Sequence, residues 1–219
     1  MEENVKFHIV FNLSISPWES SIFKGVFLWK KMELYVTIID KDKAEFVEQT
    51  KLGNNMLKFI HLFKNYSFGI SFVGIAAFVL QEIPYIIMPL VKPSQNPIMN
   101  MQNESKWIEI LQGIFGMLSM IMLILIVRDD VKLFPVETSG EKIFLSLTVL
   151  MILINFSGWT LYYLGHQYGW LIVISQFASV PMYYLFFGLW QSNFLLVGTA
   201  IPFFVIHTIN GVNNFVVKK

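Results

Sequence analysis

From Ile143 to Val217 the chain runs for 75 residues without a single Asp, Glu, Lys or Arg. A surface that faces water carries charged side chains, so a stretch of this length predicts helices surrounded by lipid. The composition agrees, because 55% of the residues are hydrophobic and only 14% are charged. Typical soluble domains have about 45–50% apolar and about 25% charged residues. We therefore predict an integral membrane protein whose main contact is with the lipid bilayer.

The apolar runs are long enough for helices that cross the membrane. A spanning helix needs about 20 apolar residues, because its backbone donors and acceptors must be paired within the segment. Continuous runs such as MLSMIMLILIV argue against a β-barrel, whose strands alternate weakly over about ten residues. A soluble helical domain would need charged outer faces, which the last three segments lack. The sequence predicts an all-α polytopic membrane protein with about five transmembrane helices, at 67–91, 107–127, 143–164, 169–190 and 194–212.

The chain divides into a small mixed N-terminal segment, residues 1–64, and a transmembrane domain, residues 65–219. Alternating apolar residues in VKFHIVFNLSIS indicate a half-buried strand, and MELYVTIID suggests a second one. The run MLKFIHLFK places its apolar side chains on one helical face, so we expect an interfacial helix there. Met32 offers an alternative start, which leaves open whether residues 1–31 belong to the natural protein.

The distribution of basic residues predicts the orientation of the five spans. Cytoplasmic flanks retain Lys and Arg, and an inside N-terminus puts 12 of the 16 basic residues on the inner side. When only basic residues within about 20 residues of a span are counted, six lie on the inner side and four on the outer side. We expect a multi-pass protein, in the cell membrane, with a cytoplasmic N-terminus. Aromatic residues near the predicted boundaries fit interfacial anchors: Trp107, Trp159, Tyr162, Tyr163, Tyr168, Trp170 and Trp190.

Polar residues within the spans are the candidates for a binding site, because an ionisable group in the hydrocarbon is costly and usually faces a cavity or a partner. Glu82 leads them, since it lies between Gln81 and Pro84 and an interrupted helix at membrane depth is typical of transport sites. Alternatively, the helix ends near Pro84 and Glu82 lies at the outer interface. Each span places a polar residue in its outer half, and the ligand-binding candidates are Glu82, Gln81, Gln112, Asn155, Gln176 and His207.

These candidates have two interpretations. If they face one another, they line a pocket open to the outside, with Glu82 as its charged member and His207 as a proton partner. Alternatively, the Asn and Gln side chains only pair neighbouring helices, at about 0.6 kcal/mol each. Pairs of small residues, Ser175 with Ser179 and Gly113 with Gly116, favour close helix approach.

Several chemistries have no support in the sequence. The chain has no cysteine, which removes thiolate metal ligands and cysteine nucleophiles, and no metal-binding spacing such as HExxH occurs. We expect no cofactor and no metal, and His166 joins a metal site only if the fold brings it to Glu82 and His207. A net charge of +1 without a dense basic run gives no basis for nucleic-acid binding.

Three classes of function remain, and no catalytic residue can be named. The first is a small transporter, or a membrane subunit of one, with an outward-facing polar pocket. The second is an intramembrane enzyme acting on a lipid-like substrate, with Glu82 and His207 as general acid and base. The third is a non-catalytic protein that binds a protein partner through its N-terminal segment or through the inner loop with Arg128, Asp129, Asp130 and Lys132. We favour transport, and an enzyme is the less expected outcome because no nucleophile or metal motif is present.

Overall fold

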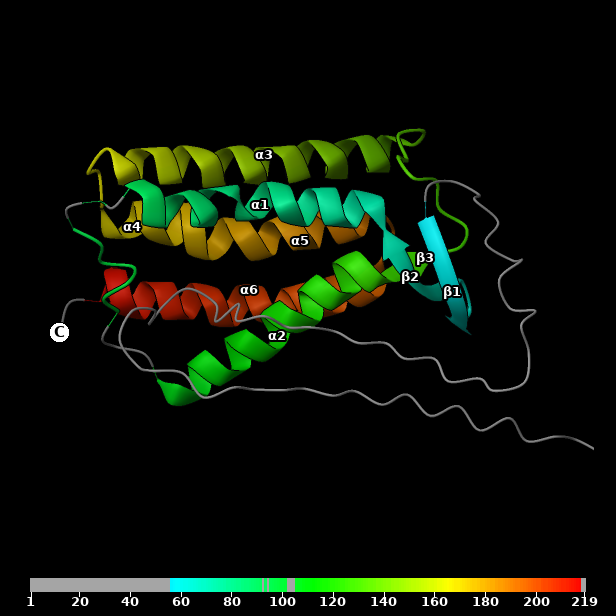
Figure 1. The fold of residues 1–219 in the computed structure, drawn as a ribbon, viewed down its shortest axis with the longest axis horizontal. Coiled ribbons are helices and arrows are strands. Elements are labelled where there is room, and N and C mark those ends of the chain that lie inside the picture. The colour runs from blue at the N-terminus through cyan, green and yellow to red at the C-terminus, as the bar shows by residue number, and fades with distance from the viewer. Residues whose placement is uncertain (1–55, 92, 94, 102–104, 218–219) are drawn as a thin grey trace, which may run out of the picture.

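The computed structural model describes residues 56–217 except 92, 94 and 102–104. The predicted strands near 5–16 and 32–40, and the question about residues 1–31, lie outside these residues. Helices dominate the described part and run along its long axis (Figure 1). They are α1 (Phe72–Val91), α2 (Lys106–Leu125), α3 (Ser139–Tyr163), α4 (Gly169–Ile172), the π-helical segment η1 (Val173–Ala178), α5 (Ser179–Trp190) and α6 (Phe194–Phe215).

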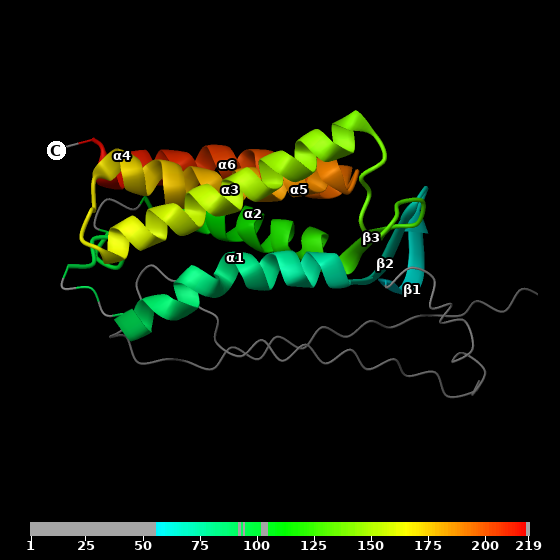
Figure 2. The ribbon, with the colours of Figure 1, turned by 90° about the horizontal axis from the view of Figure 1, so that it is seen from above.

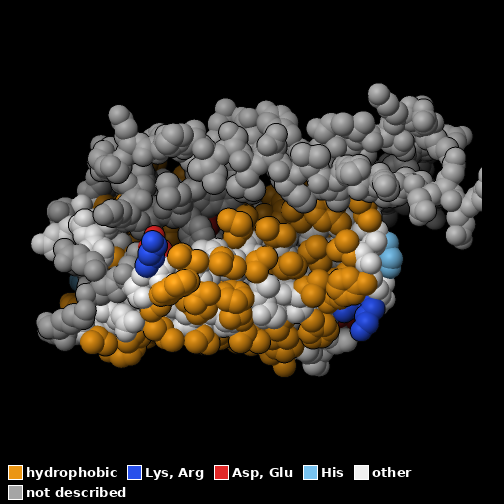
Figure 3. Space-filling model, turned by 90° about the horizontal axis from the view of Figure 1, so that it is seen from below, with side chains coloured by type: hydrophobic (Ala, Val, Ile, Leu, Met, Phe, Trp, Pro, Cys, Tyr) orange, Lys and Arg blue, Asp and Glu red, His pale blue; other side chains and the backbone are white. Residues whose placement is uncertain are grey.

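Four helices are long and apolar enough to cross a membrane, namely α2, α3, the continuous rod Gly169–Trp190 and α6. The chain therefore has the helices of a multi-pass membrane protein, as predicted. In α1 the apolar part covers Phe72–Met88, which is shorter. Figure 3 shows hydrophobic side chains over the middle of one face of the molecule, with basic side chains toward its two ends. This distribution is that of a lipid-facing belt between two polar ends.

A three-stranded antiparallel sheet lies at one end of the helices (Figure 1). Its order is β1 (Met56–Phe63), β2 (Tyr66–Ser71) and β3 (Ile126–Arg128). The interfacial helix predicted for MLKFIHLFK is therefore wrong, because this run is β1. The predicted boundary between residues 64 and 65 falls in the hairpin turn, where Lys64 adopts a positive φ of 50°. Helix α1 begins at Phe72, five residues after the predicted start of its span.

The sheet fastens the ends of several helices together. Strand β2 leads directly into α1, and β3 directly follows α2, so the pairing of Tyr66 with Arg128 joins these two helix ends. The hydroxyl oxygen of Tyr66 accepts a bond of 3.0 Å from the backbone N–H of Phe194 at the start of α6. Asn193 caps α6 and donates to the carbonyls of Met122, at 3.0 Å, and Ile126, at 3.2 Å. These bonds fix the end of the bundle at which the sheet lies.

The rod formed by α4, η1 and α5 is the central element of the bundle. In its most apolar stretch 67% of the residues are buried, whereas the corresponding share is 17–28% in the other three long helices. It packs against α3 and α6, and glycines allow both approaches. A Cβ atom on Gly158 of α3 would lie 2.0 Å from Ser175, and one on Gly211 of α6 would lie 2.6 Å from Phe177.

The structure divides the predicted aromatic anchors into two groups. Trp107, Tyr168 and Trp170 are 59–73% exposed, as anchors at a membrane surface would be. Trp159, Tyr162 and Trp190 are at most 3% exposed and belong to the core instead. Tyr162 donates a bond of 2.7 Å to Asn96, which secures the 95–101 segment over the opposite end of the bundle from the sheet.

Candidate functional site

Glu82 lies near the middle of α1, ten residues from its first residue. Beyond the first turn it is the only Asp, Glu, Lys or Arg in any helix that the structure describes. Its side chain is half-buried, and it forms no ion pair or hydrogen bond with another described residue. The carboxylate lies close enough to Tyr85 and Tyr184 to act electrostatically on both hydroxyls. Glu82 is thus an interior acid among phenols, without a basic partner in the described part.

Helix α1 continues through Pro84 to Val91 and does not end near Pro84. The proline has no N–H to donate to the carbonyl of Leu80, and Figure 2 shows α1 bending along its length. The hydroxyl of Tyr163 donates a bond of 2.6 Å to the carbonyl of Pro84 itself. Glu82 therefore lies within a bent helix, about 15 Å from its start at about 1.5 Å per residue.

Three tyrosines donate hydrogen bonds to one face of α1. Tyr183 donates to the carbonyl of Ala77 at 3.0 Å, and Tyr184 donates to the side-chain oxygen of Gln81 at 2.9 Å. The third tyrosine, Tyr163, donates to the carbonyl of Pro84. The three acceptors follow one another at spacings of four and three residues, which is one face of an α-helix. Gln81, a predicted site residue, thus belongs to the attachment of α1 to α3 and α5.

Asn155 on α3 is fully buried and lies next to the same aromatic group. Its amide donates to the carbonyl of Ser175 at 2.8 Å and, more weakly, to Ser179 at 3.4 Å. Its side-chain oxygen and the indole N–H of Trp159 lie near the Tyr85 hydroxyl, yet neither forms a hydrogen bond of good geometry. The Tyr85 ring packs edge-on against Trp159 at 5.0 Å between centroids. Two buried polar atoms therefore remain available beside Tyr85.

Gln176 lies in the π-helical segment, and it is 3% exposed. Within the described residues, neither its amide nitrogen nor its amide oxygen has a hydrogen-bond partner. Pro181 gives a local reason for the wide π turn, because it cannot donate to the carbonyl of Phe177 and its ring crowds that carbonyl. A buried amide with both ends unpaired is unusual in a folded protein and is a frequent mark of a site that holds a polar molecule.

Gln112 and His207 form a second polar group, between α2 and α6. The Nδ1 atom of His207 lies 3.1 Å from the side-chain oxygen of Gln112, which also accepts from Asn210 at 3.1 Å. The imidazole ring lies between Phe177 and Phe203, at centroid distances of 4.7 and 5.0 Å. Phe203 in turn stacks on Tyr184, so aromatic contacts connect this group to the one around Glu82.

The six predicted residues therefore fall into two connected groups and one isolated amide. The first group lies around Tyr85 and Tyr184 and contains Gln81, Glu82 and Asn155. The second is the pair of Gln112 and His207. The isolated amide is that of Gln176, which has no partner in the described part. The two described pockets lie elsewhere: one of about 20 Å³ beside β3, and an open apolar groove of about 390 Å³ along α3 and α4. Within the described residues no three His, Cys, Asp or Glu side chains gather to hold a metal, and His166 stacks on Tyr168 instead.

Sequence reasoning missed the tyrosines of this site. Tyr85, Tyr183 and Tyr184 lie inside the predicted spans, whereas an anchoring tyrosine lies at a span end. A tyrosine buried in lipid or protein needs a partner for its hydroxyl, so its depth was the signal that could have identified it. Asn210, which shares the acceptor Gln112 with His207, was also missed, because it lies two residues from the predicted end of its span.

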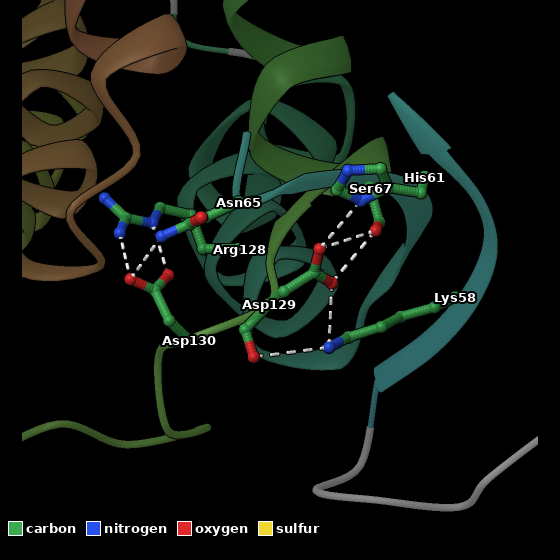
Figure 4. A network of polar contacts seen from close by, with 7 residues as sticks. All are labelled: Lys58, His61, Asn65, Ser67, Arg128, Asp129 and Asp130. Carbon is green, nitrogen blue, oxygen red and sulfur yellow. Dashed lines mark hydrogen bonds and ion pairs between the residues drawn. The ribbon is translucent and has the colours of Figure 1, made fainter. Parts of the chain in front are cut away.

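A separate charged network lies at the sheet (Figure 4). Asp129 forms an ion pair of 2.9 Å with Lys58, and both of its carboxylate oxygens lie 2.9 Å from the hydroxyl of Ser67, which donates one bond shared between them. Burial alone would raise the pKa of Asp129, but the bonds from Lys58 and Ser67 outweigh it, so this pKa lies below its ordinary value. Arg128, through its bidentate pair with Asp130, likewise lowers the pKa of that carboxyl.

This network attaches the hairpin to the loop after α2. Arg128 also donates to the carbonyl of Ser192 at 3.0 Å and lies 5.6 Å from the centre of the Tyr66 ring. Asn65, in the hairpin turn, donates to Asp130 at 2.9 Å. Each charge has a partner within the network, so the arrangement is structural.

Comparison of the chain with protein-family models, with curated proteins and with solved structures finds no match. The class of protein therefore follows from the fold alone. Four helices that are long and apolar enough to cross a bilayer, joined by short polar connections, define a multi-pass membrane protein.

Proposed function

We propose that this protein is a small transporter, or a membrane subunit of one, whose polar solute binds beside Glu82. In this proposal α1 is a fifth span, the protein lies in the cell membrane, and the N-terminus is cytoplasmic. Figure 1 supports the fifth span, because α1 runs between the same two ends of the bundle as the other four helices. Its single charged residue faces phenolic hydroxyls, which agrees with an internal solute site.

The observation that carries the proposal is the position of Glu82. A carboxylate in the middle of a lipid-embedded helix costs at least about 2.5 kcal/mol, and such residues commonly mark solute or proton pathways. The carbonyl of Leu80, to which Pro84 cannot donate, and the unpaired atoms of Asn155 and Gln176 are further polar groups within the described helices. A purely structural helix would gain nothing from this charge, since no basic side chain pairs with it in the described part.

Uptake by reconstituted protein tests the proposal. Proteoliposomes that contain the full-length chain are incubated with a mixed pool of small metabolites, and mass spectrometry identifies those that accumulate inside. We expect at least one solute to enter with wild-type protein and not with Glu82→Gln. Glu109→Gln is the matched control, because Glu109 lies in the first turn of α2. Uptake that is absent with wild type, or equal in Glu82→Gln, contradicts transport.

The exposed apolar side chains of β1 favour a second candidate, a protein that binds a partner through the N-terminal part of the chain. Phe59, Ile60, Leu62 and Phe63 are 44–49% exposed, and β1 is an edge strand of the described sheet. Rescue of a deletion strain distinguishes the candidates. Partner binding predicts that the double variant Ile60→Lys, Phe63→Lys fails to rescue while Glu82→Gln succeeds. The reverse pattern contradicts partner binding and agrees with transport.

An intramembrane enzyme receives less support than either. That alternative uses Glu82 and His207 as an acid and base pair. Among the described residues His207 contacts Gln112 and two phenylalanines, whereas Glu82 neighbours Tyr85 and Tyr184. In the described part the rings of Tyr184 and Phe203 lie between the two groups.

A further inference from the structure

We propose that the site beside Glu82 takes a small organic cation, a substituted ammonium whose alkyl groups pack on aromatic rings. This inference rests on the proposed function and names its solute class. Three independent features of the described residues carry it: an acid without a basic partner, a group of electron-rich rings around that acid, and buried acceptor atoms without donors.

The first feature is the charge of the site. Glu82 carries a negative charge when ionised, and no Lys or Arg lies in any described helix beyond its first turn. A carboxylate in a poorly solvated site is stabilised by a cation that arrives with the solute. An anionic solute would instead meet an uncompensated like charge. The sign of the charge therefore selects a cation over an anion.

The second feature is the aromatic surroundings. Trp159 is 1% exposed, and its ring contacts Tyr85 edge-on at 5.0 Å and stacks on Tyr163 at 5.4 Å. Tyr184, the other phenol beside Glu82, stacks on Phe203 at 6.3 Å. Faces of Trp and Tyr rings attract ammonium groups, and Trp is the best of them. Alkyl groups on the nitrogen gain apolar contact with the same rings.

The third feature is the set of unpaired polar atoms. Among the described residues, the side-chain oxygen of Asn155 is buried without a donor. In Gln176, which follows the Ser175 to which Asn155 bonds, the side-chain oxygen lacks a donor and the amide nitrogen lacks an acceptor. These oxygens suit an N–H or hydroxyl group on the solute. The tyrosine hydroxyls of Tyr163, Tyr183 and Tyr184 already donate to α1, so they offer an anion little.

A metal cation fits the site poorly. Mg²⁺ and Ca²⁺ require about six or more oxygen ligands, mostly carboxylates, carbonyls and water. Here one carboxylate lies beside the phenols Tyr85 and Tyr184, and the described residues hold no cluster of three acidic or histidine side chains. Aromatic faces suit a weakly hydrated organic cation better than a strongly hydrated metal ion.

Entry of the solute requires α1 to move. Glu82 lines neither of the described pockets, and Trp159 and Tyr184 are buried. Helix α1 is attached to α3 and α5 by phenolic hydrogen bonds, which water can replace when the helices separate. The bend at Pro84 lies next to Glu82, so motion of the outer half of α1 would open the site at this residue.

Binding of choline to purified full-length protein in nanodiscs tests the solute class. Its uncharged isostere, 3,3-dimethylbutan-1-ol, has the same shape without the positive charge. We expect choline and tetramethylammonium to raise the unfolding temperature and the isostere to leave it unchanged. Glu82→Gln should abolish the shift, Trp159→Leu should weaken choline binding at least about tenfold, and Glu109→Gln should bind like wild type.

The inference and the proposed function can fail separately. No shift with either cation, or an equal shift with the isostere, overturns the organic-cation proposal. If Glu82-dependent uptake of another solute persists in proteoliposomes, transport stands and only the solute class is wrong. If the cations bind through Glu82 but no solute is taken up, the site stands and transport is wrong.

Discussion

Tyr184 on α5 donates a hydrogen bond of 2.9 Å to the side-chain oxygen of Gln81 on α1. Gln81 is the sequence neighbour of Glu82, and Tyr184 belongs to the buried rod Gly169–Trp190, so this bond attaches α1 to the rod beside Glu82. With the bonds from Tyr183 and Tyr163, it makes the attachment of α1 depend on phenolic side chains along one face. The strength of that attachment determines how readily the surroundings of Glu82 can open.

Removing single hydroxyls should weaken this attachment. Tyr184→Phe leaves the oxygen of Gln81 buried without a donor, so we expect a loss of about 0.6–1.7 kcal/mol in the free energy of unfolding. Tyr183→Phe should lose less, because the carbonyl of Ala77 keeps its place in the helix. Unfolding in mixed detergent micelles measures both. Tyr168→Phe, at a residue that is 69% exposed, should match wild type, and an equal loss there would contradict a specific role for Tyr184.

Two glycines of α3 and α6 provide a matched test of helix packing. In Gly158→Ala the new Cβ would lie 2.0 Å from the Ser175 side chain, so α3 and the central rod must separate. We expect a loss of about 1–3 kcal/mol in the free energy of unfolding. A Cβ on Gly198 meets nothing within 4 Å, so Gly198→Ala should cost nothing. Similar stabilities of the two variants would contradict the close contact between Gly158 of α3 and Ser175 of the central rod.

The sequence predicts most of this bundle because long apolar runs leave few alternatives to a membrane helix. Four of the five predicted spans coincide with helices long enough to cross, and their ends differ by only a few residues. The wrong prediction of an interfacial helix at residues 56–63 has a physical reason. In MLKFIHLFK the polar residues Lys58, His61 and Lys64 recur at every third position, which favours a helical face over an alternating strand. The pairing of Met56–Phe63 with Tyr66–Ser71, which itself pairs with the distant Ile126–Arg128, overrides this local pattern.

The candidate site was less accessible to sequence reasoning. Depth along a helix follows from residue number, so the sequence could assign the candidates to the outer halves of the predicted spans. Two of them, Gln112 and His207, are bonded. Rotation about each helix axis does not follow from depth. For that reason the sequence could not separate the Gln112–His207 pair from the group around Glu82. The unpaired amide of Gln176 depends on a local π turn, which no apolar pattern reveals.

The network at the sheet should make stability depend on acid pH. The folded-state pKa values of Asp129 and Asp130 are lowered, so their contribution is complete at neutral pH. It is lost as the pH falls through those lowered values, below about 4. Asp129→Asn should reduce the free energy of unfolding at neutral pH by up to about 1 kcal/mol and flatten its decline in acid. Thermal unfolding across pH measures this, with the exposed Glu137→Gln as control; an unchanged acid decline in Asp129→Asn would contradict it.

The topology can be tested with single cysteines, since the chain has none of its own. If α1 spans the membrane, Lys64→Cys and Gln95→Cys should react with an impermeant reagent from opposite sides. Lys132→Cys should share the side of Lys64, because both lie at the sheet end of the bundle. Reaction of positions 64 and 95 from the same side would show that α1 does not cross.

The decisive measurement is the reactivity toward water-borne reagents of a cysteine at position 82. A small impermeant methanethiosulfonate reagent is applied to proteoliposomes containing Glu82→Cys, with Ile86→Cys as the lipid-facing control on the same helix, since Ile86 is 63% exposed. A solute site that opens by motion of α1 predicts that position 82 reacts as the helix opens and that position 86 does not. If position 82 is as unreactive as position 86, water does not reach Glu82, and a solute site beside it is contradicted.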